Sequence, residues 1–153
     1  MESFSQVIDH VEHLCKVNGT RLTTKRKAAL SLLVKSGKAL SAYELMDAYK
    51  TETGAALPAM SMYRILDFLV AEHFVHKLDL VNKYVVCEHI VNEGEHVQAQ
   101  FLICAKCQKV KEIRMSKDLT RALQKNIKEA GFHLESRQLE LNCICEQCLE
   151  QNI

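Results

Sequence analysis

Two pairs of cysteines with the spacing C-x-x-C are the residues of this sequence best suited to do chemistry. The first pair is Cys104 and Cys107, and the second pair, near the end of the sequence, is Cys145 and Cys148. A C-x-x-C loop directs two thiolates towards one tetrahedral ion, and two such loops complete a four-sulfur site for structural zinc. Such a site would join the first strand of a small domain to its last, and the metal-binding free energy would become folding free energy.

The same spacing leaves two other interpretations open: a thiol-disulfide pair, and a set of inert buried thiols. A redox pair needs one exposed and acidic cysteine pair on a βαβ frame. This sequence has two pairs, each following a strand-like segment, so the zinc interpretation is favoured. Cys143, in the segment CICEQC, is predicted to be an alternating strand residue rather than a ligand.

A second group of residues with metal-ligand chemistry is scattered through the middle of the chain. Its members come from four different segments: His76, Cys87, His96 and Glu112. Taken singly, each has a simpler interpretation, because a lone histidine is usually a surface or core residue and Cys87 suits a packed strand. Sequence spacing does not establish that the four meet, and it leaves open that His89 or Glu95 replaces one of them.

The composition indicates a folded protein of the cytoplasm. The 153 residues are 48% hydrophobic and 25% charged, enough for a buried core in one domain or two small ones. No apolar run approaches the roughly 18 residues that cross a bilayer, and the N-terminal segment is amphipathic, unlike a signal peptide. We therefore expect a cytoplasmic location without membrane contact, where seven cysteines favour metal binding over disulfides.

Charge is distributed unevenly along the chain. The net charge of +1 favours no class of partner, but residues 21–27, RLTTKRK, form a local basic cluster. Lys25, Arg26 and Lys27 in this cluster could contact phosphate groups. The simpler interpretation is the solvated start of a helix.

These candidate residues must be positioned by helices in the first half of the chain. Thr23 or Thr24 can cap one helix, and Ser41 with Glu44 forms a capping box that opens the next, predicted to run to about Tyr49. A further helix is predicted in residues 56–73, because four apolar residues fall at helical spacing. They are Met62, Ile65, Leu66 and Leu69.

Two short strands, residues 74–80 and 83–87, are predicted to form a hairpin after these helices. Helices followed by a hairpin are typical of a winged helix-turn-helix, in which one helix enters the DNA major groove. Many small helical domains share this order without binding nucleic acid, so the order alone is moderately specific.

The second half is predicted to be a small unit of strands and one helix. Strands are expected over residues 97–104, 109–115 and 132–145, and a helix over residues 116–131. The fold class is therefore α+β, with residues 88–95 as a polar linker between the two parts.

In their order, these motifs resemble the ferric uptake regulator family, and within it the zinc-uptake branch, from about residue 15 to residue 148. RLTTKR is similar to the family's R-L-T-P-Q-R, SAYELMD to S-A-x-x-L, and SMYRILDFL to the recognition helix T-V-Y-R-x-L-x-x-L. FVHK and the two C-x-x-C pairs complete the order. Thr24 replaces the usual proline, and EHVQAQF keeps only His96 of the iron branch's H-H-x-H-x-H run, which weakens an iron or peroxide interpretation.

The resemblance implies two zinc ions per subunit, one structural and one regulatory. The structural ligands would be Cys104, Cys107, Cys145 and Cys148, and the regulatory ligands His76, Cys87, His96 and Glu112. It also implies three segments: a winged-helix DNA-binding domain (1–83), a hinge with sensor ligands (84–97), and a dimerisation domain with the structural zinc (98–153).

The resemblance further implies a homodimeric, zinc-loaded repressor of zinc-uptake genes that binds a near-palindromic operator in double-stranded DNA. The residues expected to contact DNA are Tyr43, Ser61, Tyr63, Arg64, Lys25 and Arg26. For Arg64 the rival interpretation is a surface ion pair with Asp67. The alternative is an iron-, manganese- or peroxide-responsive regulator of the same fold, and a thiol redox protein is less favoured. Neither an enzyme activity nor a small organic substrate is expected.

Overall fold

The computed structural model describes residues 3–88, 90, 99–135 and 138–151 of the chain. The chain divides into two compact units, Met1–Glu93 and Gly94–Ile153. Every helix in the described part of the chain is too short or too polar to cross a lipid bilayer.

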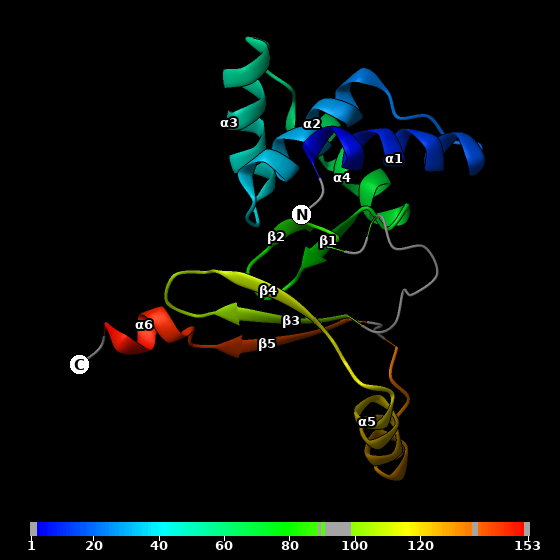
Figure 1. Ribbon diagram of the computed structural model, residues 1–153, viewed down its shortest axis with the longest axis vertical. Helices are drawn as coiled ribbons and strands as arrows, with labels where there is room; N and C mark the ends of the chain where they lie inside the picture. Colours follow the sequence, from blue (N-terminus) through cyan, green and yellow to red (C-terminus); the bar gives the residue numbers. More distant parts are fainter. Residues whose placement is uncertain (1–2, 89, 91–98, 136–137, 152–153) are drawn as a thin grey trace. The chain divides into compact units, whose positions relative to one another are not determined.

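The N-terminal unit contains four helices followed by a two-stranded hairpin (Figure 1), which is the predicted winged helix-turn-helix order. The elements are α1 Phe4–Val17, α2 Thr24–Ser36, α3 Ala42–Thr53, α4 Ala59–Ala71, β1 Val75–Leu78 and β2 Lys83–Val86. Helix α2 packs against α1, α3 and α4, and α4 packs against β1.

Side-chain caps start three of these helices, and Ser3 caps α1. The Ser41 hydroxyl accepts a hydrogen bond from the Glu44 amide, and the Glu44 carboxylate accepts one from the Ser41 amide, both at 3.1 Å. This confirms the predicted capping box. Thr23, and not Thr24, caps α2 by accepting a hydrogen bond from the Arg26 amide at 3.3 Å.

The end of α3 and the start of α4 differ from the prediction, and each difference has a backbone cause. Helix α3 continues beyond Tyr49 to Thr53 and ends where Gly54 adopts a φ of 76°, a left-handed conformation that glycine tolerates. Helix α4 begins at Ala59, because Pro58 occupies the N-cap with extended backbone geometry.

The predicted apolar stripe of α4 lies in the core of this unit. Met62, Leu66 and Leu69 have no exposed surface, and Ile65 is 7% exposed. Side chains from α1, α2, α3 and β1 complete the core, among them Val11, Leu30, Leu33, Leu45 and Val75. Burying each such aliphatic side chain contributes roughly 1.5–3 kcal/mol to folding, so α4 is fixed mainly by its inner face.

The hairpin formed by β1 and β2 is attached to the start of α3. Tyr84 exchanges two backbone hydrogen bonds with Leu40, of 2.7 and 2.9 Å. The Lys83 ammonium group lies 3.1 Å from the Glu44 carboxylate. Strand β2 reaches Val86, so the predicted domain end at residue 83 falls inside a strand.

The C-terminal unit contains a three-stranded sheet and two helices, in the order β3 Ala99–Cys104, β4 Val110–Arg114, α5 Lys117–Glu129, β5 Gln138–Cys143 and α6 Glu146–Glu150. The strand order is β4-β3-β5, with β3 antiparallel to β4 and parallel to β5. In Figure 1, α6 follows β5 at one end of this sheet and α5 follows β4 at the other. The α+β fold class is therefore confirmed.

The last strand is shorter than predicted, and a helix follows it. Residues 132–135 form no strand, so β5 begins at Gln138 and ends at Cys143. Helix α6 contains Cys148 and has Cys145 as its N-cap, and no prediction included this helix.

Candidate metal sites and nucleic-acid interface

The four cysteines of the two C-x-x-C pairs meet in the C-terminal unit. The sulfur atoms of Cys104, Cys107, Cys145 and Cys148 all lie within 4.8 Å of one another. Cys107 Sγ and Cys145 Sγ are 3.7 Å apart. A tetrahedral zinc ion with bonds of about 2.3 Å to sulfur needs sulfurs about 3.8 Å apart, so the arrangement fits zinc.

Backbone geometry explains why the first pair turns inwards. Cys104 is the last residue of β3, and its amide donates to the Lys109 carbonyl at 2.9 Å. Gln108, with a φ of 61°, closes the turn by donating from its amide to the Cys104 carbonyl at 2.9 Å. The turn therefore points both thiols of the first pair to one side.

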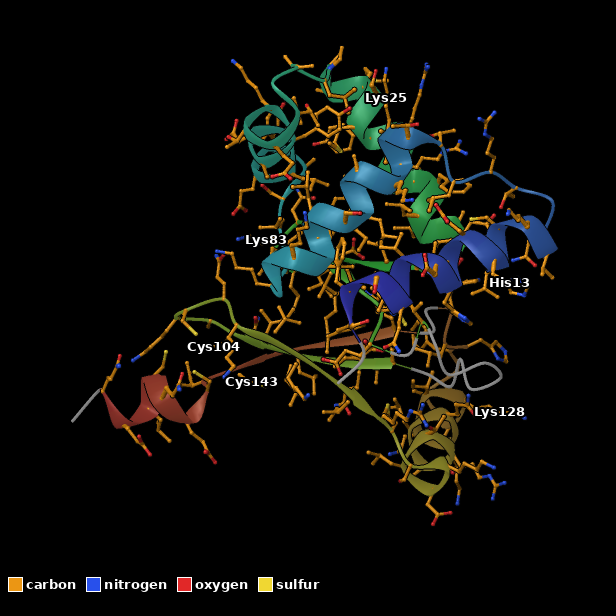
Figure 2. All side chains as sticks on the ribbon, turned by 45° about the horizontal axis from the view of Figure 1, so that its top comes forward. His13, Lys25, Lys83, Cys104, Lys128 and Cys143 are labelled. Atoms are coloured by element: carbon orange, nitrogen blue, oxygen red, sulfur yellow. The ribbon has the colours of Figure 1, made fainter. Side chains whose placement is uncertain are left out.

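The second pair reaches the same point through strand pairing. Because β5 lies parallel to β3, Cys143 faces Cys104 across the sheet (Figure 2), and the chain enters α6 directly afterwards. Cys145 is the N-cap of α6, and its amide donates to Cys104 Sγ at 3.4 Å. Cys143 is half-buried, and the four-sulfur cluster of the described residues does not include it.

The pKa values of two thiols in this cluster are shifted in opposite directions. Hydrogen bonds from the backbone amides of Cys107 and Cys145 lower the pKa of Cys104 to about 6. Hydrogen bonds to the sulfurs of Cys145 and Cys107 raise the pKa of Cys148 to about 12. The N–H groups aimed at Cys104 stabilise its thiolate, the form that binds a metal.

The N-terminal unit brings together two of the predicted regulatory ligands. The Cys87 amide extends the ladder of the hairpin by donating to the Phe74 carbonyl at 2.9 Å. His76, two residues after Phe74, is therefore a diagonal neighbour of Cys87 on the same face of the hairpin. Ligand atoms of His76 and Cys87 lie within 4.8 Å of each other.

The other two predicted regulatory ligands belong to the second part of the chain. Glu112, on β4, is only 7% exposed. It is the one buried charged side chain among the residues that the structure describes. A carboxylate is retained in such a position when it is paired, hydrogen-bonded or bound to a cation. That it joins His76 and Cys87 stays a prediction. His96, like His89, lies outside the described residues.

Three of the six residues predicted to contact DNA are exposed on the N-terminal unit, namely Tyr43, Arg64 and Lys25. Tyr43 on α3 is 64% exposed. Arg64 on α4 is exposed, and the ion pairs formed within the described ranges do not include one with Asp67. Ser61 and Tyr63 are half-buried.

In the basic cluster, Lys25 is exposed on the first turn of α2 (Figure 2). Arg26 is half-buried, because its guanidinium lies over the ring of Phe68 on α4, 3.7 Å from the ring centroid. Met60, on the first turn of α4, is a large apolar side chain that is 66% exposed.

Known proteins match this chain over most of its length. The ferric uptake regulator family model matches residues 17–142. The zinc uptake regulation protein of Escherichia coli (strain K12) is 32% identical, covering 95% of this chain and 82% of that protein. The ferric uptake regulation protein of Helicobacter pylori (strain J99) is 24% identical, covering 99% and 97%.

Solved structures show the same fold. A zinc uptake regulator complexed with zinc and DNA superimposes with a TM-score of 0.83 at 27% identity, covering 99% of this chain and 98% of that chain. The crystal structure of holo XcZur gives a TM-score of 0.77 at 36% identity, covering 97% and 99%. The family match, the E. coli relative and the fold together identify the chain as a member of the ferric uptake regulator family.

Proposed function

We propose that this protein is a zinc-responsive, sequence-specific DNA-binding repressor of zinc-uptake genes, active as a zinc-loaded homodimer in the cytoplasm, and not an enzyme. The observation that carries the proposal is the pair His76 and Cys87. It places an imidazole and a thiol together on the wing hairpin, and β1 of this hairpin packs against α4. A metal bound there would act on the element that holds the recognition helix.

The proposal assigns different tasks to the two groups of ligands. Cys104, Cys107, Cys145 and Cys148 hold the structural zinc that closes the C-terminal sheet. His76, Cys87, His96 and Glu112 hold the regulatory zinc and so join the wing, the hinge at 84–97 and the dimerisation domain at 98–153. The mixed nitrogen, sulfur and oxygen donors of the second group suit zinc, a borderline-soft ion.

The energy available at the second site is sufficient for a switch. Changing a two-state protein from 1:99 to 99:1 requires about 5.5 kcal/mol of differential binding. Structural zinc sites supply about 10 kcal/mol or more. Even a weaker, exchangeable site can therefore shift the equilibrium between two arrangements of the recognition helices of the dimer.

On the DNA side, α4 is the proposed recognition helix. Arg64 projects from the face opposite the buried stripe and can donate two hydrogen bonds to the O6 and N7 of a guanine. Ser61, Tyr63 and Tyr43 would complete the surface in the major groove. Lys25 would contact a phosphate group, which positions the domain without reading sequence.

Two features of the C-terminal unit support a homodimer. Among the residues that the structure describes, β5 is an edge strand of the sheet, and its Leu141 is 43% exposed. Helix α5 carries Leu119, Leu123 and Ile127 on one stripe, yet has no buried residue. An apolar stripe and a sheet edge of this kind are suited to a second copy. A symmetric dimer presents two recognition helices and predicts a near-palindromic operator.

Operator binding measured with each of several metals in turn tests this function. An operator is first selected from random duplex DNA with the zinc-loaded protein, and its binding is then titrated with zinc, iron(II) and manganese(II) by fluorescence anisotropy. We expect zinc to promote binding at the lowest free concentration. Promotion by iron(II) or manganese(II) at lower concentrations would assign the protein to another metal response within the same family.

A further inference from the structure

Arg26 connects two segments of the N-terminal unit that are far apart in the sequence. Its guanidinium lies 3.7 Å from the centroid of the Phe68 ring on α4. Its Nη1 donates a hydrogen bond of 2.8 Å to the carbonyl oxygen of Arg21, in the connection between α1 and α2. One side chain therefore holds the start of the basic cluster against α4.

Phe68 lies close to Arg64 on α4, so the Arg26–Phe68 contact affects the helix proposed to read DNA. Phe68 follows Arg64 by four residues, so the two side chains are neighbours along the surface of α4. Arg21, in the connection that Arg26 holds, and Lys25, on the first turn of α2, are both exposed. The contact therefore sets the distance between these two cationic groups and the base-reading arginine of α4.

We infer that Arg26 is a positioning residue for DNA binding: it holds Arg21 and Lys25 in register with α4 and does not itself neutralise a DNA phosphate. The inference rests on the proposed DNA-binding function. Only a planar guanidinium can both stack on a ring and direct an N–H to a carbonyl beside it, so lysine is not equivalent at this position.

Salt dependence separates positioning from phosphate contact. Each phosphate contact contributes about 0.9 to the slope of log K against log salt concentration. Because a homodimer has two copies of each side chain, loss of a phosphate contact should reduce the slope by about 1.8. Loss of a positioning contact should weaken binding without that reduction.

The test compares Arg26→Gln, Arg26→Lys, Phe68→Leu and the double variant Arg26→Gln/Phe68→Leu with the wild type, using the selected operator and the zinc-loaded full chain. We expect each single variant to lose affinity on the order of tenfold with an unchanged salt slope. The double variant should lose little more than either single variant, because both changes break one contact. Lys25→Gln is the matched control, and its slope should fall by about 1.8.

Two results of this test would overturn the inference about Arg26. Arg26→Lys with wild-type affinity, or Arg26→Gln with a slope reduced like that of Lys25→Gln, would make Arg26 a phosphate contact and overturn the inference while leaving the proposed function intact. If circular dichroism shows that Arg26→Gln does not fold, Arg26→Lys and Phe68→Leu decide by the same criteria. Failure of the wild type to select any operator would overturn both proposals.

Discussion

Cys104 and Cys143 face each other across the parallel strands β3 and β5, and the amide of Ala105 donates to the Cys143 carbonyl at 2.9 Å. This register places the ends of the two strands together. The C-x-x-C pair at the end of each strand therefore meets the other pair, although the two lie at opposite ends of the unit's sequence.

Removing one sulfur of the cluster should unfold the C-terminal unit. Cys104→Ser leaves three sulfurs for an ion whose binding contributes on the order of 10 kcal/mol. We expect the loss of one zinc per chain, measured by atomic emission, and loss of structure, measured by circular dichroism. Cys143→Ser is the matched control and should keep its full zinc content. A zinc lost from the control would make Cys143 a ligand.

Removing the thiol from the proposed regulatory ligands should abolish the zinc response but leave the protein folded. Cys87→Ser should abolish zinc-dependent operator binding, because one of the proposed ligands that join the wing to the rest of the site is gone. The melting curve of the variant should show a folded protein. Cys15→Ala changes another buried thiol of the same unit and should keep the zinc response. Global collapse of Cys87→Ser would argue against a purely regulatory role.

Arg64→Lys keeps the charge on α4 but removes the two-pronged hydrogen bond to a base. We expect discrimination against a substituted guanine to fall by about 1–3 kcal/mol at one position of each half-site. The salt slope should stay unchanged, because a cation remains. Anisotropy titrations with single-base variants of the operator measure both quantities. Uniform weakening across all DNA sequences would instead assign Arg64 to the phosphate backbone.

The charge on Glu44 should stabilise the N-terminal unit only above acidic pH. The Ser41 amide, followed by the Lys83 ammonium group, lowers the pKa of Glu44 below its ordinary value of 4.5. A lowered carboxyl pKa contributes stability that is present above pH 4.5 and is lost as the pH falls through the folded-state pKa.

Glu44→Gln should therefore cost up to about 1 kcal/mol at pH 7, a small effect because the carboxylate is partly exposed and screened. Urea unfolding of the variant and the wild type at several pH values gives this difference, which should vanish in acid. Glu52→Gln breaks a more exposed pair with Lys35, of 3.6 Å, and should cost less. A Glu44→Gln difference that is independent of pH would mean that the charge has no role.

Local sequence patterns predicted the features that depend on nearby residues. The capping box of Ser41 and Glu44 involves residues three apart, and the stripe from Met62 to Leu69 repeats with the period of the helix. The convergence of the four cysteines was also predictable, because the chemistry of zinc requires four ligands of this kind.

Features that depend on tertiary contacts were not predictable. The stacking of Arg26 on Phe68 joins α2 to α4, and no spacing in the sequence indicates it. The meeting of His76 and Cys87 depends on the hairpin register, in which Leu78 pairs with Lys83 beside the turn and Val75 pairs with Val86. The Phe74–Cys87 hydrogen bond extends this ladder by one pair at its open end. The apolar pattern of residues 132–145 likewise did not show that residues 132–135 form no strand, whereas Gln138–Cys143 pair with β3.

The most direct test of the central claim measures zinc content and operator binding in the same fully reduced sample during mild chelation. The account predicts two zinc ions per chain at the start. Loss of one should abolish operator binding while the dimer stays folded, and added zinc should restore binding. A folded protein with one zinc per chain that binds its operator as tightly as the two-zinc form would contradict the account.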